Sequence, residues 1–483
     1  MLTIEEIKHF IQKDTMSKKK QLAKLGDRYY EGDHDIKNYK LYYYNEDEEL
    51  VEDKSRSNIK ISHPFFTELV DQKVQYLFSS DEGFIKSKIP ELQEILDDNF
   101  NHNRNFRGAI EDSSYDASIM GFGFVYLFKD KQGNLKYQCA DTLGVIDVEA
   151  KETEDNNDYI IYWYVDRIDK DNKQIKKIQV WSDKEVAYYT QVGNEEMQLE
   201  EVRPHNVFTI TGQEGRRGDS FGFIPFFKLK NNRKEISDLK PVKEIIDDYD
   251  LMACGLSNNI QDASEYVVVV KGFEGGDVSK IQKNIKTKKA MGVPNDGGDV
   301  DFKTIDIPYQ ARKEKLALDK ENIYKAGMGY DSSQLGDGNI TNVVIKTRYA
   351  SLDLKCNKFE RQLYELLENI VEVFLDMYNA ENKTAYSVKD VEFKFTRETP
   401  TNELDNVTIE KTKEESKQVT INYLLSLIAT LGNEKVVELI CETLDIDYDE
   451  IKDKLPKDET DISDVENDLN NAPIDPPINE GVA

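Results

Sequence analysis

Long apolar runs are absent from this chain, and their absence sets the first limits on its class. No stretch reaches about 18 uncharged apolar residues, the length that a helix needs to cross a bilayer. The segment from Met1 to Asp14 carries Glu5, Lys8 and Lys13 where a secretion signal would be apolar. We therefore expect neither a membrane span nor a signal peptide. Hydrophobic residues still make up 39% of the 483 residues, which can supply cores for roughly three domains.

Cysteine and histidine are scarce and scattered. The four cysteines form no CxxC pair, so we interpret them as reduced thiols of a cytoplasmic protein. The five histidines show no HxH, HExxH or His-Cys spacing, the patterns that hold zinc. These residues are Cys139, Cys254, Cys356 and Cys441, together with His9, His34, His63, His102 and His205. We expect no metal site, no cofactor and no catalytic residues.

Enzyme motifs are nearly absent as well. No GxxxxGK[ST] loop occurs, and Gly121 and Gly123 precede the strand-like run FVYLF, whereas a dinucleotide fingerprint places its glycines between a strand and a helix. The run DVEAK resembles the element of metal-dependent nucleases in which carboxylates hold a cation and a lysine orients water. A nuclease using Asp147, Glu149 and Lys151 therefore remains an alternative, although such triplets arise by chance when 33% of residues are charged.

Positive charge is in short supply. The chain has 93 acidic against 64 basic residues, a formal net charge of −29. Proteins that grip nucleic acid need an excess of Lys and Arg to replace phosphate counterions. A nucleic acid partner would have to be held locally or merely passed along.

The residue patterns that the chain does contain predict an α+β protein. Thr3 and Glu6 form a capping box, and a second helix is expected from Ser17 to Tyr30. The runs HPFFTELVDQKVQYLFS and FRGAIEDSSYDASIMG keep helical spacing. From Phe122 to about Leu199, aromatic and β-branched runs such as DYIIYWYVDRI are broken by Asp, Asn and Gly, which predicts an antiparallel β-rich module.

The middle of the chain predicts two helices around a basic insert. Ser237 or Asp238 can cap a helix that tolerates Pro241 in its first turn and ends before EYVVVVKG, a short strand. A second helix is expected in YQARKEKLALDKENIYKAGMG. Between them, Lys271 to Lys289 holds six lysines against two acidic residues. We expect a helical hairpin with a small α/β module at its tip.

A polar loop precedes one of the longest apolar-periodic runs of the chain. Residues 331–342 are rich in Ser, Gly, Asp and Asn, and apolar positions then recur every three or four residues from Ile345 to Met377. This spacing predicts a helix of about 35 residues, or roughly 50 Å. A helix of that length needs support on more than one side, both within one subunit and between subunits.

Four stretches stand in a fixed order around these elements: YYEGDHDI (Tyr29 to Ile36), VDQKVQYLF (Val70 to Phe78), IPFFKLKNN with SDLKPVKEIIDDYD (Ile224 to Asp250), and FKFTRETPTN (Phe393 to Asn402). Their order resembles that in the portal proteins of tailed bacteriophages, of the type found in siphophages of Gram-positive hosts. The resemblance covers nearly the whole chain and departs at the carboxyl terminus and in the detail of the insert.

The resemblance implies a domain plan for a portal-type subunit. The implied parts are a wing (1–237), stem helix 1 (238–264), a clip (265–304), stem helix 2 (305–330), a tunnel loop (331–342), a long wing helix and strand (343–400) and a helical crown (401–456). The tail 457–483, with eight acidic residues and one lysine, is expected to be disordered whatever the family.

The resemblance also implies a function and its partners. Copies of the chain would form a ring, usually dodecameric, at one capsid vertex, through which double-stranded DNA is packaged and ejected. Expected partners are the terminase large subunit, a head-completion adaptor, and the major capsid and scaffolding proteins, with DNA as cargo that is not tightly bound and with no membrane. The expected location is the virion, after assembly in the host cytoplasm.

Two sets of site residues follow from that plan. The loop residues expected to face DNA are Ser332, Ser333, Gln334, Gly336, Asp337, Gly338, Asn339 and Asn342. The clip residues expected to dock the motor and the adaptor are Lys280, Lys283, Lys286, Lys288 and Lys289. A metal-dependent nuclease or other phage hydrolase, and a scaffold or adaptor that forms no ring, remain the alternatives.

Overall fold

The computed structural model describes residues 2–45, 47–54, 56–130, 133–149, 157–209, 216–263, 267–271, 299–303, 309–335, 342–399, 403–444, 446 and 448. The chain divides into two compact units. One contains Met1–Asp337 with Lys346–Thr399, and the other contains Gly338–Ile345 with Pro400–Ala483.

The first unit begins with two capped helices, α1 (Ile4–Thr15) and α2 (Lys18–Tyr30). The predicted capping box is confirmed, because the Thr3 hydroxyl accepts from the Glu6 amide while Glu6 accepts from the Thr3 amide. The Ser17 hydroxyl caps α2 by accepting from the Lys20 amide at 3.1 Å. A short two-stranded hairpin follows, made of β1 (Tyr42–Tyr44) and β2 (Leu50–Glu52).

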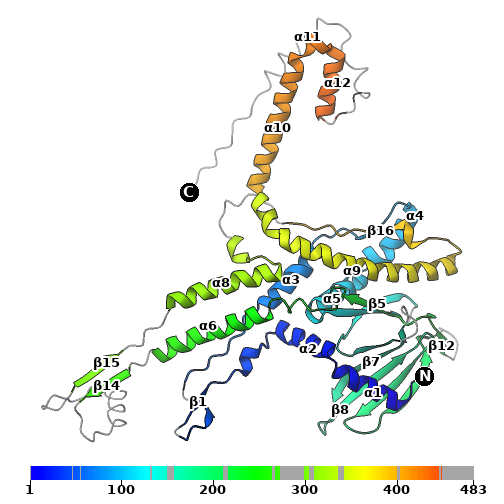
Figure 1. Ribbon diagram of the computed structural model, residues 1–483. Helices are drawn as coiled ribbons and strands as arrows, with labels where there is room; N and C mark the ends of the chain where they lie inside the picture. The colour runs from blue at the N-terminus through cyan, green and yellow to red at the C-terminus, as the bar shows by residue number, and fades with distance from the viewer. Residues whose placement is uncertain are drawn as a thin grey trace. The chain divides into compact units, whose positions relative to one another are not determined.

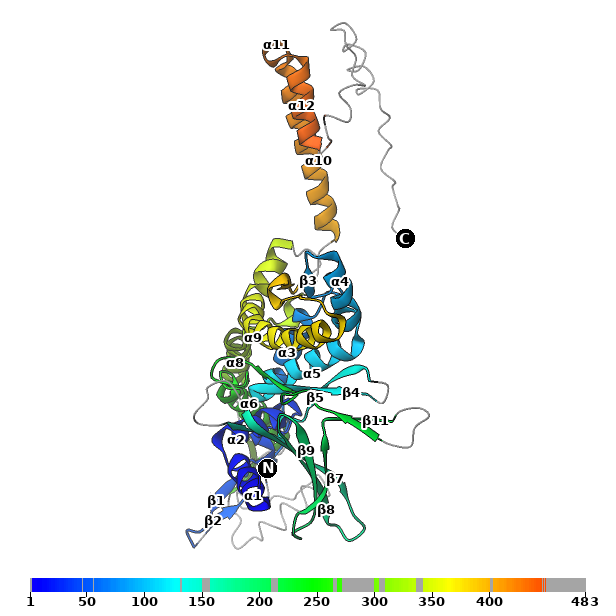
Figure 2. The same cartoon turned by 90° about the vertical axis from the view of Figure 1, so that its right-hand side faces the viewer.

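Three further helices belong to this unit, and the first and third of them lie between the long helix α9 (Asn342–Asn382) and the larger sheets, as Figure 2 shows. They are α3 (Phe65–Leu77), α4 (Pro90–Leu96) and α5 (Arg104–Met120). Helix α5 ends at Gly121, whose φ of 97° is the left-handed conformation that glycine adopts without strain. A Cβ at Gly121 would also lie 2.4 Å from the Glu235 carbonyl oxygen, so the chain turns here only because glycine is present.

The predicted antiparallel β-rich module is confirmed, and it consists of several sheets. Strand β4 pairs with both β13 and β5 in a three-stranded sheet of order β13-β4-β5, and β6 to β10 form a five-stranded sheet in the order β10-β9-β8-β7-β6. The strands are β4 (Phe122–Lys129), β5 (Leu135–Ala140), β6 (Val145–Glu149), β7 (Asn157–Ile168), β8 (Gln174–Trp181), β9 (Glu185–Val192), β10 (Gln198–Pro204) and β13 (Phe226–Lys230). Two small pairs are β11 (Asn206–Thr209) with β12 (Arg216–Asp219), and β16 (Val391–Phe393) with β3 (Ile85–Ser87).

The main core of this unit lies where the helices meet the three-stranded sheet. It collects fully buried side chains such as Phe66 and Leu69 of α3, Phe122 of β4 and Ile246 of α6 (Lys243–Ala263). A smaller core places Ile7 of α1 against the five-stranded sheet. The two cores together hold the amino-terminal helices on the same scaffold that supports α6.

Two antiparallel helices leave the scaffold side by side. They are α6 and α8 (Tyr309–Gly327), and the chain between them contains the strand pair β14 (Val267–Lys271) with β15 (Asp299–Lys303) (Figure 1). Helix α6 begins at Lys243, later than the predicted cap at Ser237 or Asp238, because residues 238–242 form turns and Asp238 is engaged elsewhere. The two-helix arrangement itself is confirmed.

Helix α9 has 41 residues and is somewhat longer than predicted. The predicted stripe is buried at Tyr349, Leu352, Cys356, Phe359 and Leu363, and burial continues through Leu375. The second unit contains the helices α10 (Glu403–Ser426), α11 (Ile428–Leu431) and α12 (Asn433–Leu444). Among the described residues, no helix is both long enough and apolar enough to span a membrane.

Candidate functional site

The structure describes only part of the predicted loop and none of the predicted clip lysines. Ser332 and Ser333 are exposed and lie in a 3-10 turn, Ser332–Leu335, together with Gln334. Gly336, Asp337, Gly338 and Asn339 lie outside the described residues, as do Lys280, Lys283, Lys286, Lys288 and Lys289. Asn342 is the first residue of α9 and is only 8% exposed.

The start of the loop is fixed by an ion pair. The Lys320 ammonium on α8 lies 2.8 Å from the Asp331 carboxylate, which also accepts from the Ser333 amide at 3.0 Å. Burial alone would raise the pKa of Asp331, but the hydrogen bonds from Lys320 and Ser333 lower it. Asp331 therefore stays ionised and holds the 3-10 turn against the end of α8.

A side-chain amide on α3 holds the backbone that precedes the loop. Gln72 donates to the Tyr330 carbonyl at 2.8 Å and accepts from the Tyr330 amide at 3.1 Å. The Tyr349 hydroxyl on α9 donates to the Tyr330 hydroxyl at 2.9 Å, and the two rings lie 4.5 Å apart. The same few residues thus connect α3, the base of the loop and α9.

The turn that ends α8 has no room for larger side chains. A Cβ on Gly327 or on Gly329 would lie 2.5 or 2.4 Å from a Leu69 methyl group of α3. Met328 between them has a φ of 56°, which is uncommon for a residue other than glycine. The base of the loop is therefore packed directly onto the scaffold.

A buried lysine side chain holds the turn that precedes α6. The Lys73 ammonium of α3, 2% exposed as a side chain, donates to Asn231 Oδ1 at 2.6 Å and to Asp238 at 3.0 Å. It also lies 4.0 Å from the centre of the Phe359 ring of α9. Lys355 of α9 approaches the same Asp238 carboxylate at 3.3 Å. We call Lys73, Asn231, Asp238 and Lys355 the lysine cluster.

In the lysine cluster, the ammonium groups of Lys73 and Lys355 both contact the Asp238 carboxylate. Burial would raise the pKa of Asp238, but Lys355 and Lys73 lower it, so the carboxylate is ionised. Lys355 also donates to the Gly327 carbonyl at 3.0 Å, at the end of α8. Lys355 of α9 therefore contacts both the turn that precedes α6 and the last residue of α8.

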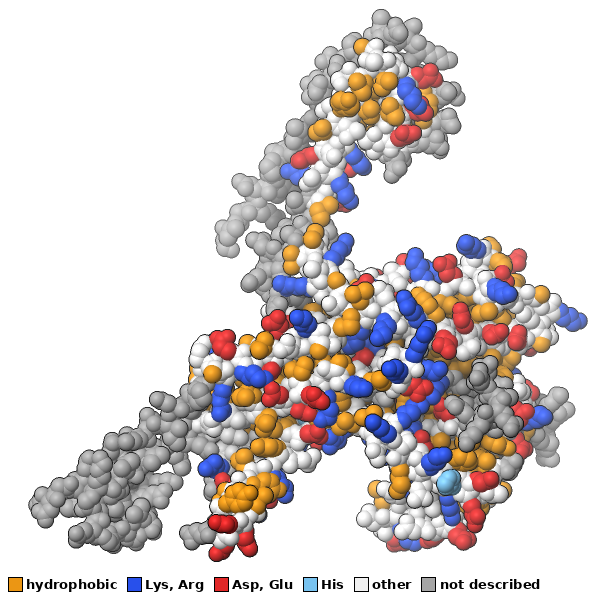
Figure 3. Space-filling view, viewed as in Figure 1, with side chains coloured by type: hydrophobic (Ala, Val, Ile, Leu, Met, Phe, Trp, Pro, Cys, Tyr) orange, Lys and Arg blue, Asp and Glu red, His pale blue; other side chains and the backbone are white. Residues whose placement is uncertain are grey.

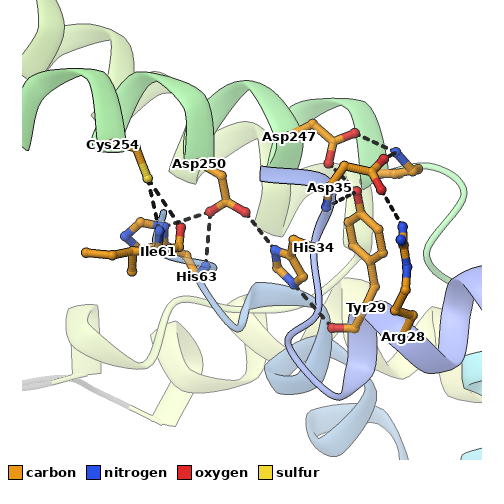
Figure 4. Close-up of polar contacts among 10 residues, drawn as sticks. Arg28, Tyr29, His34, Asp35, Ile61, His63, Asp247, Asp250 and Cys254 are labelled. Atoms are coloured by element: carbon orange, nitrogen blue, oxygen red, sulfur yellow. Dashed lines mark hydrogen bonds and ion pairs between the residues drawn. The ribbon is translucent and has the colours of Figure 1, made fainter. Parts of the chain in front are cut away.

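A second polar group holds the next turns of α6 (Figure 4). Asp250 is fully buried; its Oδ2 accepts from His34 Nδ1 at 2.6 Å, and its Oδ1 accepts from both His63 Nδ1 at 2.7 Å and the His63 amide at 3.0 Å. One helical turn further, the Cys254 thiol lies 3.2 Å from the Ile61 amide. We call His34, His63 and Asp250 the histidine cluster.

Both ring nitrogens of His34 lie against acceptors. Nδ1 lies 2.6 Å from the Asp250 carboxylate, and Nε2 lies 3.2 Å from the Tyr29 carbonyl. The imidazole ring also stacks on Tyr29, with the ring centres 4.5 Å apart. Burial would raise the pKa of Asp250, but its hydrogen bonds from His34 and His63 lower it. The buried carboxylate is therefore stabilised by two histidines.

Further ion pairs surround the histidine cluster. The Tyr29 hydroxyl donates to Asp247, and Lys243 contacts both Asp247 at 2.6 Å and Asp35 at 2.7 Å. Arg28 also pairs with Asp35. Burial and the Asp247 contact raise the pKa of Tyr29, so the phenol stays protonated as a donor. Segment 28–35 is therefore bound along the first turns of α6.

A third polar group holds the segment that follows β16. Arg397 is 9% exposed as a side chain and pairs with Asp353 and Glu360 of α9. The neighbouring Thr396 donates to Glu82, and the Glu398 amide donates to the Ser79 hydroxyl at 2.8 Å. The segment after β16 is thus bound to both α9 and the end of α3.

The quoted sequence stretches come together in these groups. YYEGDHDI supplies Tyr29 and His34, VDQKVQYLF supplies Lys73, and the stretch from Ile224 to Asp250 supplies Asn231, Asp238 and Asp250. No sequence pattern indicates that His34 and His63 share one carboxylate, because 216 and 187 positions separate them from Asp250. Pairing between distant polar residues has no periodicity to detect.

The candidate nuclease residues do not form a cation site among the described positions. Asp147 accepts from the Lys228 ammonium at 2.8 Å, and Lys228 also contacts Glu235 at 2.9 Å. Lys151 lies outside the described residues. Across the part of the chain that is described, no three His, Cys, Asp or Glu side chains are grouped so that they could hold a metal ion.

Known proteins resemble this chain along most of its length. A family model described as "Phage portal protein, SPP1 Gp6-like" matches residues 8–462. The portal protein of Bacillus phage SPP1 is 26% identical over 350 residues, which cover 70% of this chain and 66% of the relative, just under two thirds of its length. The portal protein of Clostridium phage phiCD119 is 25% identical over 397 residues, covering 77% of this chain and 84% of the relative.

A solved structure gives a weaker likeness. A chain from the neck of an empty GTA particle has a TM-score of 0.38 and 13% sequence identity, over 78% of this chain and 90% of that chain.

Proposed function

Because this chain belongs to the SPP1 Gp6-like family of phage portal proteins, we propose that its copies form a closed ring through which double-stranded DNA is packaged into a capsid and later ejected. Members of this family are structural assembly components at the head-tail connection, and the chain is not an enzyme. The proposed ring is a dodecamer at one capsid vertex of the virion, assembled in the host cytoplasm. Family membership across residues 8–462 carries the proposal.

The elements of the first unit suit such a subunit. In the proposed plan, α6 and α8 are the stem helices, residues 1–237 and 343–400 form the wing, and 265–304 form the clip. The lysine and histidine clusters hold α6 to the wing at several successive turns, which supports a stem that stays fixed while DNA moves. Residues 401–456 are the proposed crown.

We place the loop of residues 331–342 in the channel. Ser332 and Ser333 are exposed, and the loop residues include Asp331 and Asp337 but no cation. A net charge of −29 per copy disfavours tight phosphate contacts, so DNA would slide as cargo. Asn342, being 8% exposed, offers little surface for such contact.

The proposed external partners bind the clip. Lys280, Lys283, Lys286, Lys288 and Lys289 form the densest basic group of an acidic chain. Such a group would attract acidic surfaces of the terminase large subunit during packaging, and of the head-completion adaptor afterwards. Major capsid and scaffolding proteins would surround the wing.

The decisive test is the mass and shape of the purified protein. We expect particles many times the 55.8 kDa of one chain, and negative-stain images with a central channel. A monomer, a small oligomer or an open filament at all protein concentrations tested would contradict the proposal and favour an adaptor that forms no ring. Subunit number follows from native mass spectrometry of the same sample.

A further inference from the structure

An exposed aromatic hairpin projects from the scaffold beside α6. It consists of β1, β2 and their connection, and we call it the tyrosine arm. Tyr42, Tyr43 and Tyr44 are 53%, 48% and 72% exposed, and Leu50 is 60% exposed. Figure 3 shows these apolar side chains on the projection that Figure 1 labels β1. Isolated surface tyrosines are common, but here three follow one another in one strand and are paired with Leu50 and Val51 of the other.

Both faces of the tyrosine arm are apolar. The register pairs Tyr43 with Val51 and Tyr44 with Leu50, and successive residues of a strand point to opposite faces. Tyr43 and Val51 therefore lie on one face, and Tyr44 and Leu50 lie on the other. A lone two-stranded hairpin is marginally stable in water unless another surface covers it. An arm with two apolar faces fits insertion against another protein surface.

The base of the arm is held in place. The Asp53 amide donates to the Leu41 carbonyl at 2.8 Å, and Lys40 pairs with Glu52 at 3.3 Å. The chain after the arm then follows α6, where the Ile59 amide donates to Asn258 at 2.7 Å and His63 binds Asp250. The arm is therefore presented along one flank of α6 at a defined place.

Helix α8 packs on a different side of α6. Asp248 of α6 pairs with Lys315 of α8, whereas Asp250, Cys254 and Asn258 face the segment that carries the arm. Exposed apolar side chains remain on this helix pair: Leu251 is 41% exposed, Ile260 54% and Leu318 53%. The tyrosine arm thus lies along one side of the helix pair, and the helices themselves expose further apolar residues. Two different surfaces on one chain can form a heterologous contact, the kind that closes rings.

We propose that the tyrosine arm of one copy packs on the exposed apolar residues of α6 and α8 of the next copy. This inference rests on the proposed ring. Charge complementarity with α8 supports a second copy as the occupant, because the connection of the arm contains Glu46, Asp47, Glu48 and Glu49 and no cation, whereas α8 has five basic and three acidic residues. Helix α6 has one basic and five acidic residues, so the acidic tip of the arm is expected on the α8 side of the helix pair. The same acidic tip would be repelled by DNA.

A photo-crosslinker at the arm tests the contact. With p-benzoylphenylalanine in place of Tyr43, irradiated rings should give a ladder of covalent multimers on a denaturing gel, and the crosslinked peptides should come from 243–263 or 309–327. The matched control places the same group at Leu199, which is 51% exposed on β10, the edge strand of the five-stranded sheet; it should not crosslink to those helices. Rings that form but give no intermolecular crosslink from the arm, or one to any other partner or segment, would overturn the inference while leaving the proposed function intact. A wild-type preparation without rings would instead overturn the proposed function and the inference with it.

A substitution series gives a second readout. Replacing Tyr42, Tyr43 and Tyr44 together by Ser should leave the circular dichroism and thermal midpoint of the subunit unchanged, because all three are exposed. It should raise the protein concentration needed for half-assembly at least tenfold, since aromatic side chains supply much of the energy at interfaces. The control replaces Ile168 and Leu199, also exposed, by Ser. Equal assembly of the two variants would overturn the inference.

Discussion

At the scale of single residues, buried polar side chains decide how α6 is held. Asp238 precedes this helix and Asp250 lies in it, and the pKa of each is lowered, by Lys355 and Lys73 at Asp238 and by hydrogen bonds from His34 and His63 at Asp250. Removing one member of a buried charged group leaves its partner unpaired, which costs more than the pair itself contributes. Three residue-scale predictions concern Asp250, whose pKa is lowered, and Asp116, whose pKa is raised.

Asp250→Asn should loosen the scaffold end of α6. The amide replaces one acceptor oxygen by a donor, and that donor would face His34 or His63. We expect a loss of about 3–5 kcal/mol of local stability, measured by hydrogen exchange of the α6 amides. The control is Asp248→Asn on the same helix, whose side chain is 49% exposed in its pair with Lys315 and should change stability by less than about 1 kcal/mol. Equal effects of the two changes would contradict the role of the histidine cluster.

The same carboxylate sets an acid limit. The pKa of Asp250 is lowered in the folded chain, so its contribution to stability is present above the usual aspartate value of about 3.9 and is lost as the pH falls below it. Hydrogen exchange of α6 should therefore become faster in the wild type below about pH 4. In Asp250→Asn this part of the pH dependence should be absent.

Asp116→Asn should have the opposite effect at neutral pH. Asp116 on α5 accepts from the Thr142 hydroxyl at 2.8 Å, and burial raises its pKa to about 6. A carboxyl whose folded pKa is raised contributes stability below about pH 4 and loses it as the pH rises through about 6. We expect the variant to be more stable than the wild type at pH 8 by about 1–3 kcal/mol and equal to it near pH 4. Thermal midpoints across this range measure the difference, with the exposed Asp166→Asn as the control; a variant less stable at pH 8 would contradict the prediction.

At the scale of elements, side-chain contacts connect the end of α8, the base of the loop and α9. Gln72 holds Tyr330, Lys320 holds Asp331, and Lys355 connects the end of α8 with Asp238. Because the base of the loop is fixed on the scaffold, forces on the exposed loop residues would pass into α9 and the wing. The composition of the loop then matters more than its order, since its proposed task is to slide along phosphates without binding them.

Adding cations to the loop should slow DNA movement. Gln334→Lys combined with Asn339→Lys would place two cations per copy around the channel, and each would attract phosphates in a salt-dependent way. We expect slower packaging in vitro at low salt, with the difference shrinking as salt is raised. Ser332→Ala, which changes an exposed hydroxyl and no charge, should package at the wild-type rate. A wild-type rate for the lysine variant at low salt would show that the loop does not face DNA.

At the scale of the whole molecule, charge is distributed unevenly. The chain carries −29 overall, yet the insert between α6 and α8 holds six lysines against two acidic residues from Lys271 to Lys289. In a ring, this difference between the insert and the rest would be repeated in every copy. Contacts of the insert with acidic partners would then be multivalent and sensitive to salt.

Reversing the charge of the insert should separate assembly from docking. With Lys283, Lys286 and Lys289 all replaced by Glu, we expect rings of normal mass, because the change leaves the described scaffold untouched. Binding to the terminase large subunit or to the adaptor should weaken at least tenfold at low salt and differ less at high salt. Substituting the same three lysines by Arg keeps the charge and serves as the control. Unchanged binding of the Glu variant would rule out docking through these lysines.

Local chemistry in the sequence determined much of this protein. The Thr3 and Ser17 caps, the strand runs after Phe122, the two helices around the insert and the stripe of α9 each depend on residues within a few positions of one another, so they could be predicted. The order of four short stretches was enough to indicate the family. The start of α6 was predicted too early, because the environment of Asp238 depends on distant residues.

Only the tertiary structure decided what those stretches do. Lys73 meets Asp238 across 165 positions, and His34 meets Asp250 across 216, and no local pattern encodes either contact. A charged residue can be a solvated surface group, or it can be buried and connect two elements. Which of the two it is depends on the elements that cover it, and the packing of the whole scaffold decides which elements those are. The sequence therefore determined the elements and the class of the protein, whereas the folded chain decided which polar residues hold the projecting helices in place.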